Sequence, residues 1–176
     1  MKVEQLSLLD FFLLSEDKRL EYKTIYDNIT FDVDCKKWIY KEVKETQYLL
    51  RNELTYKNII DIVGIKIKGD LMSVDAHIVF GTFNGILKSI IEISEIESNA
   101  LGSTLNANEM IALEEVGGFE VFGYLPELDR LAGGDILKYE NIKNLSWEDC
   151  FSKLAMDSRQ NKFNKKIAEL IKNQND

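Results

Sequence analysis

The sequence is poor in the residues from which catalytic and metal sites are most often built. Among its 176 residues there is one histidine, His77, and the two cysteines, Cys35 and Cys150, are far apart and outside any CxxC pair. Histidine is the commonest general base, and cysteine thiolates serve as nucleophiles and zinc ligands. The sequence therefore offers little basis for a nucleophile–base pair, a zinc site or a disulfide framework. We predict a protein that is not an enzyme and that has no cofactor and no metal site.

Long apolar runs and targeting signals are also lacking. The apolar stretch Leu6–Leu14 is too short to span a bilayer and carries Asp10. The first residues do not combine a basic start, an apolar run and a small-residue cleavage site, so no signal peptide is expected. We therefore expect no membrane partner. Two cysteines that do not form a disulfide framework are typical of a protein made in a reducing compartment, which predicts cytoplasmic synthesis.

The sequence does contain enough apolar residues for a folded core, together with an uneven distribution of charge. Hydrophobic residues make up 45% and charged residues 30%, and the net charge is −8. Residues 88–135, the acidic middle, hold ten acids and two bases, whereas residues 153–172, the basic tail, hold six bases and two acids. Two interpretations stay open: these are solvated faces around a core, or the basic tail docks on the acidic middle of a neighbouring copy or of another subunit.

Nucleic acid is not an expected partner of the whole chain. The phosphate backbone requires a net basic footprint, and this chain is acidic overall. We predict no sequence-specific binding of nucleic acid.

The spacing of apolar residues predicts a mainly α-helical fold. A helix that is apolar on two faces is expected after Ser73, and such a helix is normally central to its domain. Between residues 29 and 40, apolar residues alternate with polar ones ahead of a polar turn, which predicts a small β-hairpin. Shorter helices are expected over residues 7–14, 15–27, 41–52, 55–63, 109–116, 119–132 and 135–145, with Gly133–Gly134 as a helix stop.

The last helix is the longest element that the sequence predicts outside the core. Ser146–Asp149 resembles a capping box in which Asp149 takes the usual place of glutamate, so the helix is expected to run from Trp147 to about Lys172. We predict a compact helical core domain over residues 1–145 and a long C-terminal helical arm over residues 146–176. The arm is expected to be anchored at its start and to bind partners near its end. The predicted partner-binding residues are Arg159, Lys162, Phe163, Lys165, Lys166, Ile167, Leu170 and Ile171.

Three further patterns have both a structural and a functional interpretation. Asp32 and Asp34 form a D-x-D pair that could hold Mg²⁺ or Ca²⁺, or could simply share a solvent-facing side of the hairpin. Gly81 and Gly85 form a G-x-x-x-G pattern, which favours the close approach of another helix. Cys150 is expected to be a small buried residue at the start of the last helix.

Two stretches carry a resemblance to a known class of proteins. They are FDVDCKKWIYKEVKETQYLLRNELTY over Phe31–Tyr56 and LPELDRLAGGDILKYENIKNLSWEDCFSKL over Leu125–Leu154. Together they resemble small virion-associated proteins of tailed bacteriophages, especially crAss-like phages of gut Bacteroidales. The resemblance implies a non-enzymatic structural subunit of a head–tail connector ring or adaptor, located in the virion after synthesis in the host bacterial cytoplasm. Its implied partners are other copies of itself in a ring and portal or tail subunits.

Two alternatives stay open at this point. A phage tail-assembly chaperone would be present in infected cells and absent from mature particles, and it would need an exposed apolar groove. A small metal-dependent enzyme would need acids that converge on a pocket, for which Asp32 and Asp34 are the only local pair.

Overall fold

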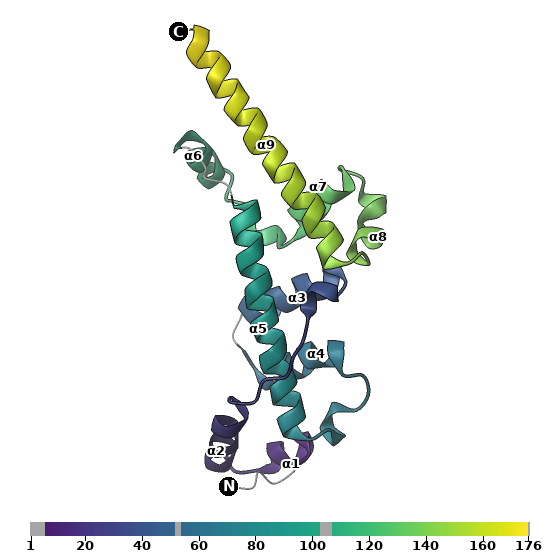
Figure 1. The fold of residues 1–176 in the computed structure, drawn as a ribbon. Helices are drawn as coiled ribbons and strands as arrows, with labels where there is room; N and C mark the ends of the chain where they lie inside the picture. Colours follow the sequence, from purple (N-terminus) through teal and green to yellow (C-terminus); the bar gives the residue numbers. More distant parts are fainter. Residues whose placement is uncertain (1–5, 52–53, 103–106, 176) are drawn as a thin grey trace. The chain divides into compact units, whose positions relative to one another are not determined.

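The computed structural model describes residues 6–51, 54–102 and 107–175, without the side chains of residues 107 and 173–175. Within these residues the secondary structure is helical, which confirms the predicted mainly α class, and the only strand-like pairing is two isolated β-bridges (Figure 1). Short 3₁₀ helices at Cys35–Lys37, Leu71–Ser73, Glu120–Phe122 and Ile136–Lys138 connect some of the α-helices. The α-helices are α1 (Leu8–Leu13), α2 (Glu16–Tyr26), α3 (Tyr40–Arg51), α4 (Tyr56–Lys66), α5 (Ala76–Leu101), α6 (Ala107–Glu115), α7 (Leu125–Ala132), α8 (Tyr139–Lys143) and α9 (Trp147–Asn175).

These elements form two compact units, each of which is described by itself. Unit 1 comprises residues 1–36 and 42–93, and unit 2 comprises residues 37–41 and 94–176. Helices α3 and α5 each contribute residues to both units. The division into a core over residues 1–145 and an arm over residues 146–176 stays a prediction.

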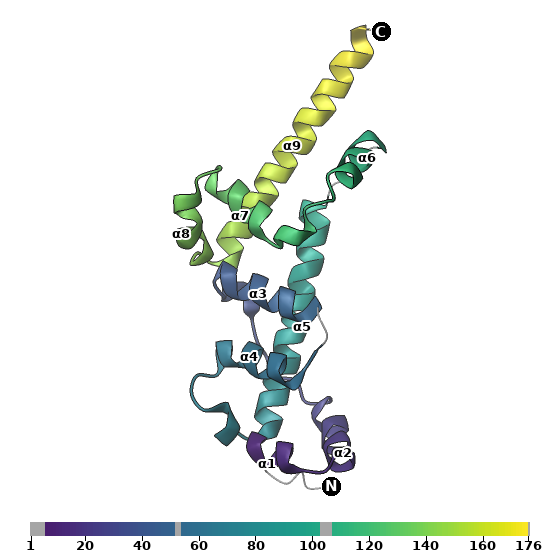
Figure 2. The same ribbon diagram turned by 180° about the vertical axis from the view of Figure 1, so that it is seen from behind.

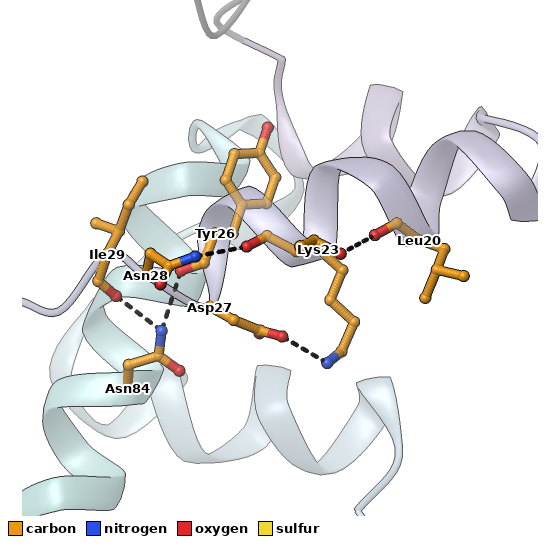
Figure 3. Close-up of polar contacts among 8 residues, drawn as sticks. Leu20, Lys23, Tyr26, Asp27, Asn28, Ile29 and Asn84 are labelled. Carbon is orange, nitrogen blue, oxygen red and sulfur yellow. Dashed lines mark hydrogen bonds and ion pairs between the residues drawn. The ribbon is translucent and has the colours of Figure 1, made fainter.

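The β-hairpin predicted for residues 29–40 does not form. The Phe31 N–H donates instead to the carbonyl oxygen of Gly81 in α5, at 3.0 Å. The side-chain amide of Asn84, also in α5, donates to the carbonyl oxygens of Tyr26 at 3.1 Å and Ile29 at 2.7 Å (Figure 3). Polar groups of a helix therefore satisfy the backbone that a second strand would have satisfied. The prediction of a hairpin was wrong.

The alternation of apolar residues that suggested a strand has another cause. Ile29, Phe31 and Val33 pack on two glycines of α5, where the missing side chains leave room for an irregular segment. A Cβ atom on Gly81 would lie 2.8 Å from both Ile29 Cγ2 and Phe31 Cε2, and one on Gly85 would lie 2.1 Å from the Phe31 carbonyl oxygen. The G-x-x-x-G pattern does allow a close approach, as predicted, but the segment that approaches is not a helix.

The core of unit 1 is rich in aromatic residues. Phe11 of α1 and Tyr26 of α2 are fully buried, and both pack on Phe80 of α5, with ring centroids 5.1 and 5.5 Å away. Helix α1 is held in place by a hydrogen bond from the Leu8 N–H to the carbonyl oxygen of Val74, 2.7 Å long. Aromatic pairs at these separations contribute stability beyond that of the area they bury. Because the rings of α1 and α2 both pack on α5, α5 is the central helix of this unit, as its two apolar faces predicted.

The core of unit 2 is built around the first turns of α9. Trp147 stacks on Phe151 with ring centroids 4.9 Å apart, and its indole N–H donates to Glu97 Oε1 at 2.7 Å. Ser146 caps the helix, since its Oγ accepts from the Asp149 N–H at 3.1 Å, as the capping-box pattern predicted. The Trp147 N–H also donates to the carbonyl oxygen of Trp38 at 2.9 Å. Residues 37–41 are thus tied to the start of α9.

Tyr40 attaches the same short segment to α7. Its hydroxyl donates to Glu127 Oε2 at 2.7 Å, and its side chain is fully buried. Burial raises the pKa of Tyr40 strongly, and the adjacent Glu127 carboxylate raises it further. Tyr40 therefore stays a neutral hydrogen-bond donor at physiological pH.

The helix predicted over residues 119–132 is interrupted. Glu120–Phe122 forms a 3₁₀ helix, Gly123 follows at φ +56°, and α7 begins only at Leu125. Gly133 ends α7 in the left-handed conformation at φ +65°, which confirms the predicted helix stop. The interruption leaves the residues before α7 as a separate turn.

Candidate protein-interaction surface

The first half of α9 is anchored in unit 2, as predicted for the start of the arm. Trp147, Cys150 and Leu154 are each 2% exposed. Ser158 is also buried, and its hydroxyl donates to the carbonyl oxygen of Ala100 in α5 at 3.2 Å. These four buried residues are three or four positions apart, so they form one buried face, as in an ordinary amphipathic helix.

The second half of α9 is exposed from Arg159 to Lys172. Every residue from Arg159 to Lys172 is exposed, so all eight predicted partner-binding residues lie on the surface. They include four large apolar side chains: Phe163 is 61% exposed, Ile167 41%, Leu170 47% and Ile171 55%. Figures 1 and 2 show this part of α9, in yellow, extending past α7 and α8 in both views.

The exposed apolar residues lie on one face of the helix. An α-helix turns by about 100° per residue, so Phe163, Ile167, Leu170 and Ile171 fall within an arc of about 100°. Met156, which is 61% exposed, lies near the centre of the same arc. We call these five residues the apolar stripe. The buried residues of the first half are centred roughly 160° away from the stripe, so the stripe faces away from the core of unit 2.

The cations of the basic tail differ in their surroundings. Lys165 Nζ pairs with Glu109 Oε1 of α6 at 2.7 Å, and Lys166 Nζ pairs with Glu169 Oε2 at 3.3 Å. Arg159 and Lys162 have no ion pair within the part of the chain that the structure describes. Lys165 lies on the face of α9 roughly opposite the stripe, whereas Arg159 and Lys166 border the stripe along one edge.

A pocket of about 760 Å³ lies along the polar side of α9. Its cationic lining comes from Arg130, Lys162, Lys165 and Lys166, and Glu169 contributes one carboxylate. The Arg130 guanidinium donates to the carbonyl oxygen of Leu154 at 2.7 Å and lies 3.8 Å from the Asp157 carboxylate. Most of the positive charge around the pocket is therefore balanced within unit 2.

A second group of exposed apolar residues runs from the end of α6 to the first residue of α7, over residues 114–125, which we call the 114–125 segment. Its acids Glu114, Glu115 and Glu120 are exposed. The sequence interpretation missed this surface because it assigned residues 114–116 and 119–125 to two helices. The missed signal was Gly123, which adopts positive φ, as do Gly117 and Gly118 at the predicted break between the two helices. The exposed apolar residues of the segment are Val116 (67%), Phe119 (58%), Val121 (82%), Phe122 (53%) and Leu125 (44%).

The other candidate residues are not brought together into a site. Groups of three or more His, Cys, Asp and Glu side chains that could hold a metal are absent from residues 6–51, 54–102 and 107–175. Asp34 Oδ1 accepts a hydrogen bond from the Lys36 N–H at 3.2 Å, as in a local turn. Cys150 is buried, as predicted, with its Sγ 3.8 Å from the carbonyl oxygen of Ile142.

Comparisons with protein-family models, with curated proteins and with solved structures find no match to this chain. Among the described residues, no helix has both the length and the apolar character needed to cross a membrane. The functional interpretation therefore depends on the geometry and charge of the chain's own surfaces, together with the resemblance of its sequence.

Proposed function

We propose that the chain is a non-enzymatic structural subunit of a tailed bacteriophage particle, acting in a head–tail connector ring or adaptor through protein–protein contacts. The observation that carries the proposal is the apolar stripe, which is exposed on the face of α9 opposite the core of unit 2. Contiguous exposed apolar side chains with a polar border mark interaction surfaces. The resemblance of Phe31–Tyr56 and Leu125–Leu154 to virion-associated proteins supplies the phage context.

The spacing within the stripe supports a helical docking element. Phe163, Ile167, Leu170 and Ile171 stand at positions i, i+4, i+7 and i+8, the pattern by which an amphipathic helix fills an apolar groove on its partner. The exposed residues from Arg159 to Lys172 span about 21 Å at 1.5 Å per residue. This length is enough to reach a neighbouring subunit without unfolding any of the anchored part of α9.

The proposal is tested by quantitative peptide mass spectrometry of purified particles of the source phage. The chain is expected in a fixed ratio to the portal protein, and that ratio would give its copy number. A phage that carries Ile167→Asp with Leu170→Asp is expected to lose the chain from its particles, because two carboxylates would be buried in the contact. The matched control carries Asn161→Asp with Ala168→Asp, which adds the same charge to exposed positions outside the stripe.

Absence of the wild-type chain from particles, with abundance in the infected-cell lysate, would contradict the connector role. That result would favour the second candidate, a tail-assembly chaperone. The observation in favour of a chaperone is the 114–125 segment, whose exposed aromatic and aliphatic side chains would suit transient binding of an apolar partner. The third candidate, a small metal-dependent enzyme, gains no supporting observation from Asp32 and Asp34.

A further inference from the structure

Unit 2 carries two exposed apolar surfaces whose surroundings have opposite charge. Residues 159–172, which include most of the apolar stripe, hold five bases and one acid, for a net charge of +4. Residues 109–127, which include the 114–125 segment, hold five acids and no base, for a net charge of −5. Apolar area supplies affinity and complementary charge supplies orientation and specificity. The two surfaces therefore have the properties of two halves of one interface.

Resting on the function proposed above, we infer that the apolar stripe binds the 114–125 segment of a second copy of this chain. Antiparallel pairing of two stripes would bring the edge that carries Arg159 and Lys166 beside the same edge of the other copy. Like charges that face each other across an interface disfavour the complex. The 114–125 segment instead offers Glu114, Glu115 and Glu120 to these cations.

The cation–acid contact that forms within one copy lies on another face of α9. Lys165 pairs with Glu109 at 2.7 Å on the side roughly opposite the stripe. That contact joins α6 to the polar face of α9, and the stripe is exposed, with Phe163 and Ile171 more than half accessible. The stripe is consequently available to a second molecule while the intramolecular pair stays intact.

The acceptor surface has the composition of an interface centre. Phe119, Val121 and Phe122 are 58%, 82% and 53% exposed within four consecutive residues. Gly118 and Gly123 bracket them at positive φ and fix the turn that presents them. Aromatic residues surrounded by polar ones are typical of the residues that dominate binding.

Such a contact joins two different patches, so each copy donates one stripe and accepts another. An interface of this kind is heterologous, and it generates a ring when the rotation closes and an open chain when it does not. The purified chain is therefore expected to self-assemble without any other component.

The test uses two full-length variants that lose opposite halves of the interface. The donor variant carries Ile167→Asp with Leu170→Asp, and the acceptor variant carries Val121→Lys with Phe122→Lys. All four positions are exposed, so both variants are expected to fold, with helix content by circular dichroism as the check. Masses are measured by light scattering after size exclusion in about 50 mM NaCl, where opposite charges are weakly screened.

The wild-type chain is expected to form oligomers, and each variant alone is expected to be monomeric, with the apparent Kd weakened at least about 100-fold. An equimolar mixture of the two variants is expected to give a one-to-one heterodimer, because the intact acceptor of one meets the intact stripe of the other. An acceptor variant that still self-associates would overturn the inference in favour of stripe-to-stripe pairing. A mixture that stays monomeric would overturn it as well.

Failure of this inference is distinguishable from failure of the proposed function. If the wild-type chain is monomeric in solution yet present in particles in a fixed ratio to the portal protein, the stripe binds another subunit and only the inference fails. If the variants complement each other in solution but the chain is absent from particles, the head-to-tail contact stands and the connector role fails.

Discussion

Substitution of Gly85 by alanine is expected to destabilise unit 1, although alanine is the better helix former. Gly85 lies inside α5, where residues 29–34 cross the helix. A Cβ atom there would lie 2.1 Å from the Phe31 carbonyl oxygen and 3.0 Å from Val33 Cγ2. Because the closer contact is with backbone rather than with the end of a flexible side chain, the whole segment has to move away from α5.

The size of the effect follows from what the segment loses. Replacing glycine by alanine in a helix interior contributes about 1 kcal/mol of stability. Against this stand the hydrogen bonds from Phe31 to Gly81 and from Asn84 to the chain before it, each contributing about 1 kcal/mol. Forcing extra volume into a packed contact costs roughly 1–3 kcal/mol more. We expect a net loss of about 2–4 kcal/mol, which for a chain of this length lowers Tm by roughly 5–15 °C.

The assay combines thermal unfolding by circular dichroism with thiol labelling of Cys35. Cys35 follows the displaced segment directly and is fully buried, with its N–H donating to Ser89 Oγ at 3.0 Å. Faster labelling of Cys35, identified by peptide mass spectrometry, would place the disturbance at this segment. Gly64→Ala is the matched control, because its Cβ would meet only Leu71 Cδ1 at 3.8 Å, an ordinary contact. It is expected to be neutral or stabilising by up to about 1 kcal/mol.

The reasoning is refuted if Gly85→Ala is as stable as Gly64→Ala and leaves Cys35 protected. That result would mean that residues 29–34 do not lie against α5. Gly81→Ala gives an internal comparison, since its Cβ would meet side-chain atoms of Ile29 and Phe31 rather than backbone. Its loss of stability is expected to be smaller than that of Gly85→Ala.

Three further predictions concern buried groups in each unit. The Tyr26 hydroxyl is buried without a hydrogen-bond partner among the described residues, so Tyr26→Phe is expected to leave stability unchanged or raise it by up to about 1 kcal/mol in urea unfolding. Burial raises the pKa of the Cys35 thiol from 9.0 to about 11. The stability that the neutral thiol contributes is therefore complete below pH 9 and is lost as the pH rises through 11. The loss of stability between denaturation curves at pH 8 and pH 10.5 should be smaller in Cys35→Ala than in the wild type. In urea unfolding at a protein concentration low enough for the chain to be monomeric, Leu154→Ala, at 2% exposure, is expected to cost about 2–4 kcal/mol. Ile167→Ala should stay within about 0.5 kcal/mol of wild type there, and similar losses for the two would contradict the division of α9 into buried and exposed halves.

The helical character and the start of α9 were predictable because their causes are local. Helical spacing of apolar residues needs no knowledge of the partner, and the Ser146 cap is set by residues three positions apart. The stop at Gly133 is equally local, since a glycine tolerates the left-handed conformation that ends a helix.

The irregular segment over residues 29–34 was not predictable in the same way. Alternating apolar residues favour a strand whenever a second strand is available, and nothing local shows that the partner is a helix. The deciding groups, Gly81, Asn84 and Gly85, lie about 50 residues further along the chain. The G-x-x-x-G pattern indicated the close approach but not the identity of the approaching segment.

The exposed 114–125 segment was missed because periodicity outweighed the turn residues. Its apolar side chains fit helical spacing, and the prediction continued a helix from residue 119 to residue 132. Gly117, Gly118 and Gly123 all adopt positive φ, which is unfavourable for residues with a side chain and incompatible with a helix interior. The break at Gly117–Gly118 was predicted, and giving Gly123 more weight would have predicted the second turn as well.

The apolar residues of α9 lie on two different faces of the helix. A helix that packs on one surface keeps its apolar residues on one face for its whole length. In α9 the apolar residues occupy one face in the first half and another in the second. Trp147, Cys150 and Leu154 point into unit 2, whereas the apolar stripe is centred roughly 160° away from them around the helix axis. No single rigid surface of unit 2 can cover both faces, because the helix continues without a break from Trp147 to Asn175. Unit 2 of the same copy therefore leaves the second apolar face exposed, and the basic residues beside that face suit the acidic, apolar partner proposed above.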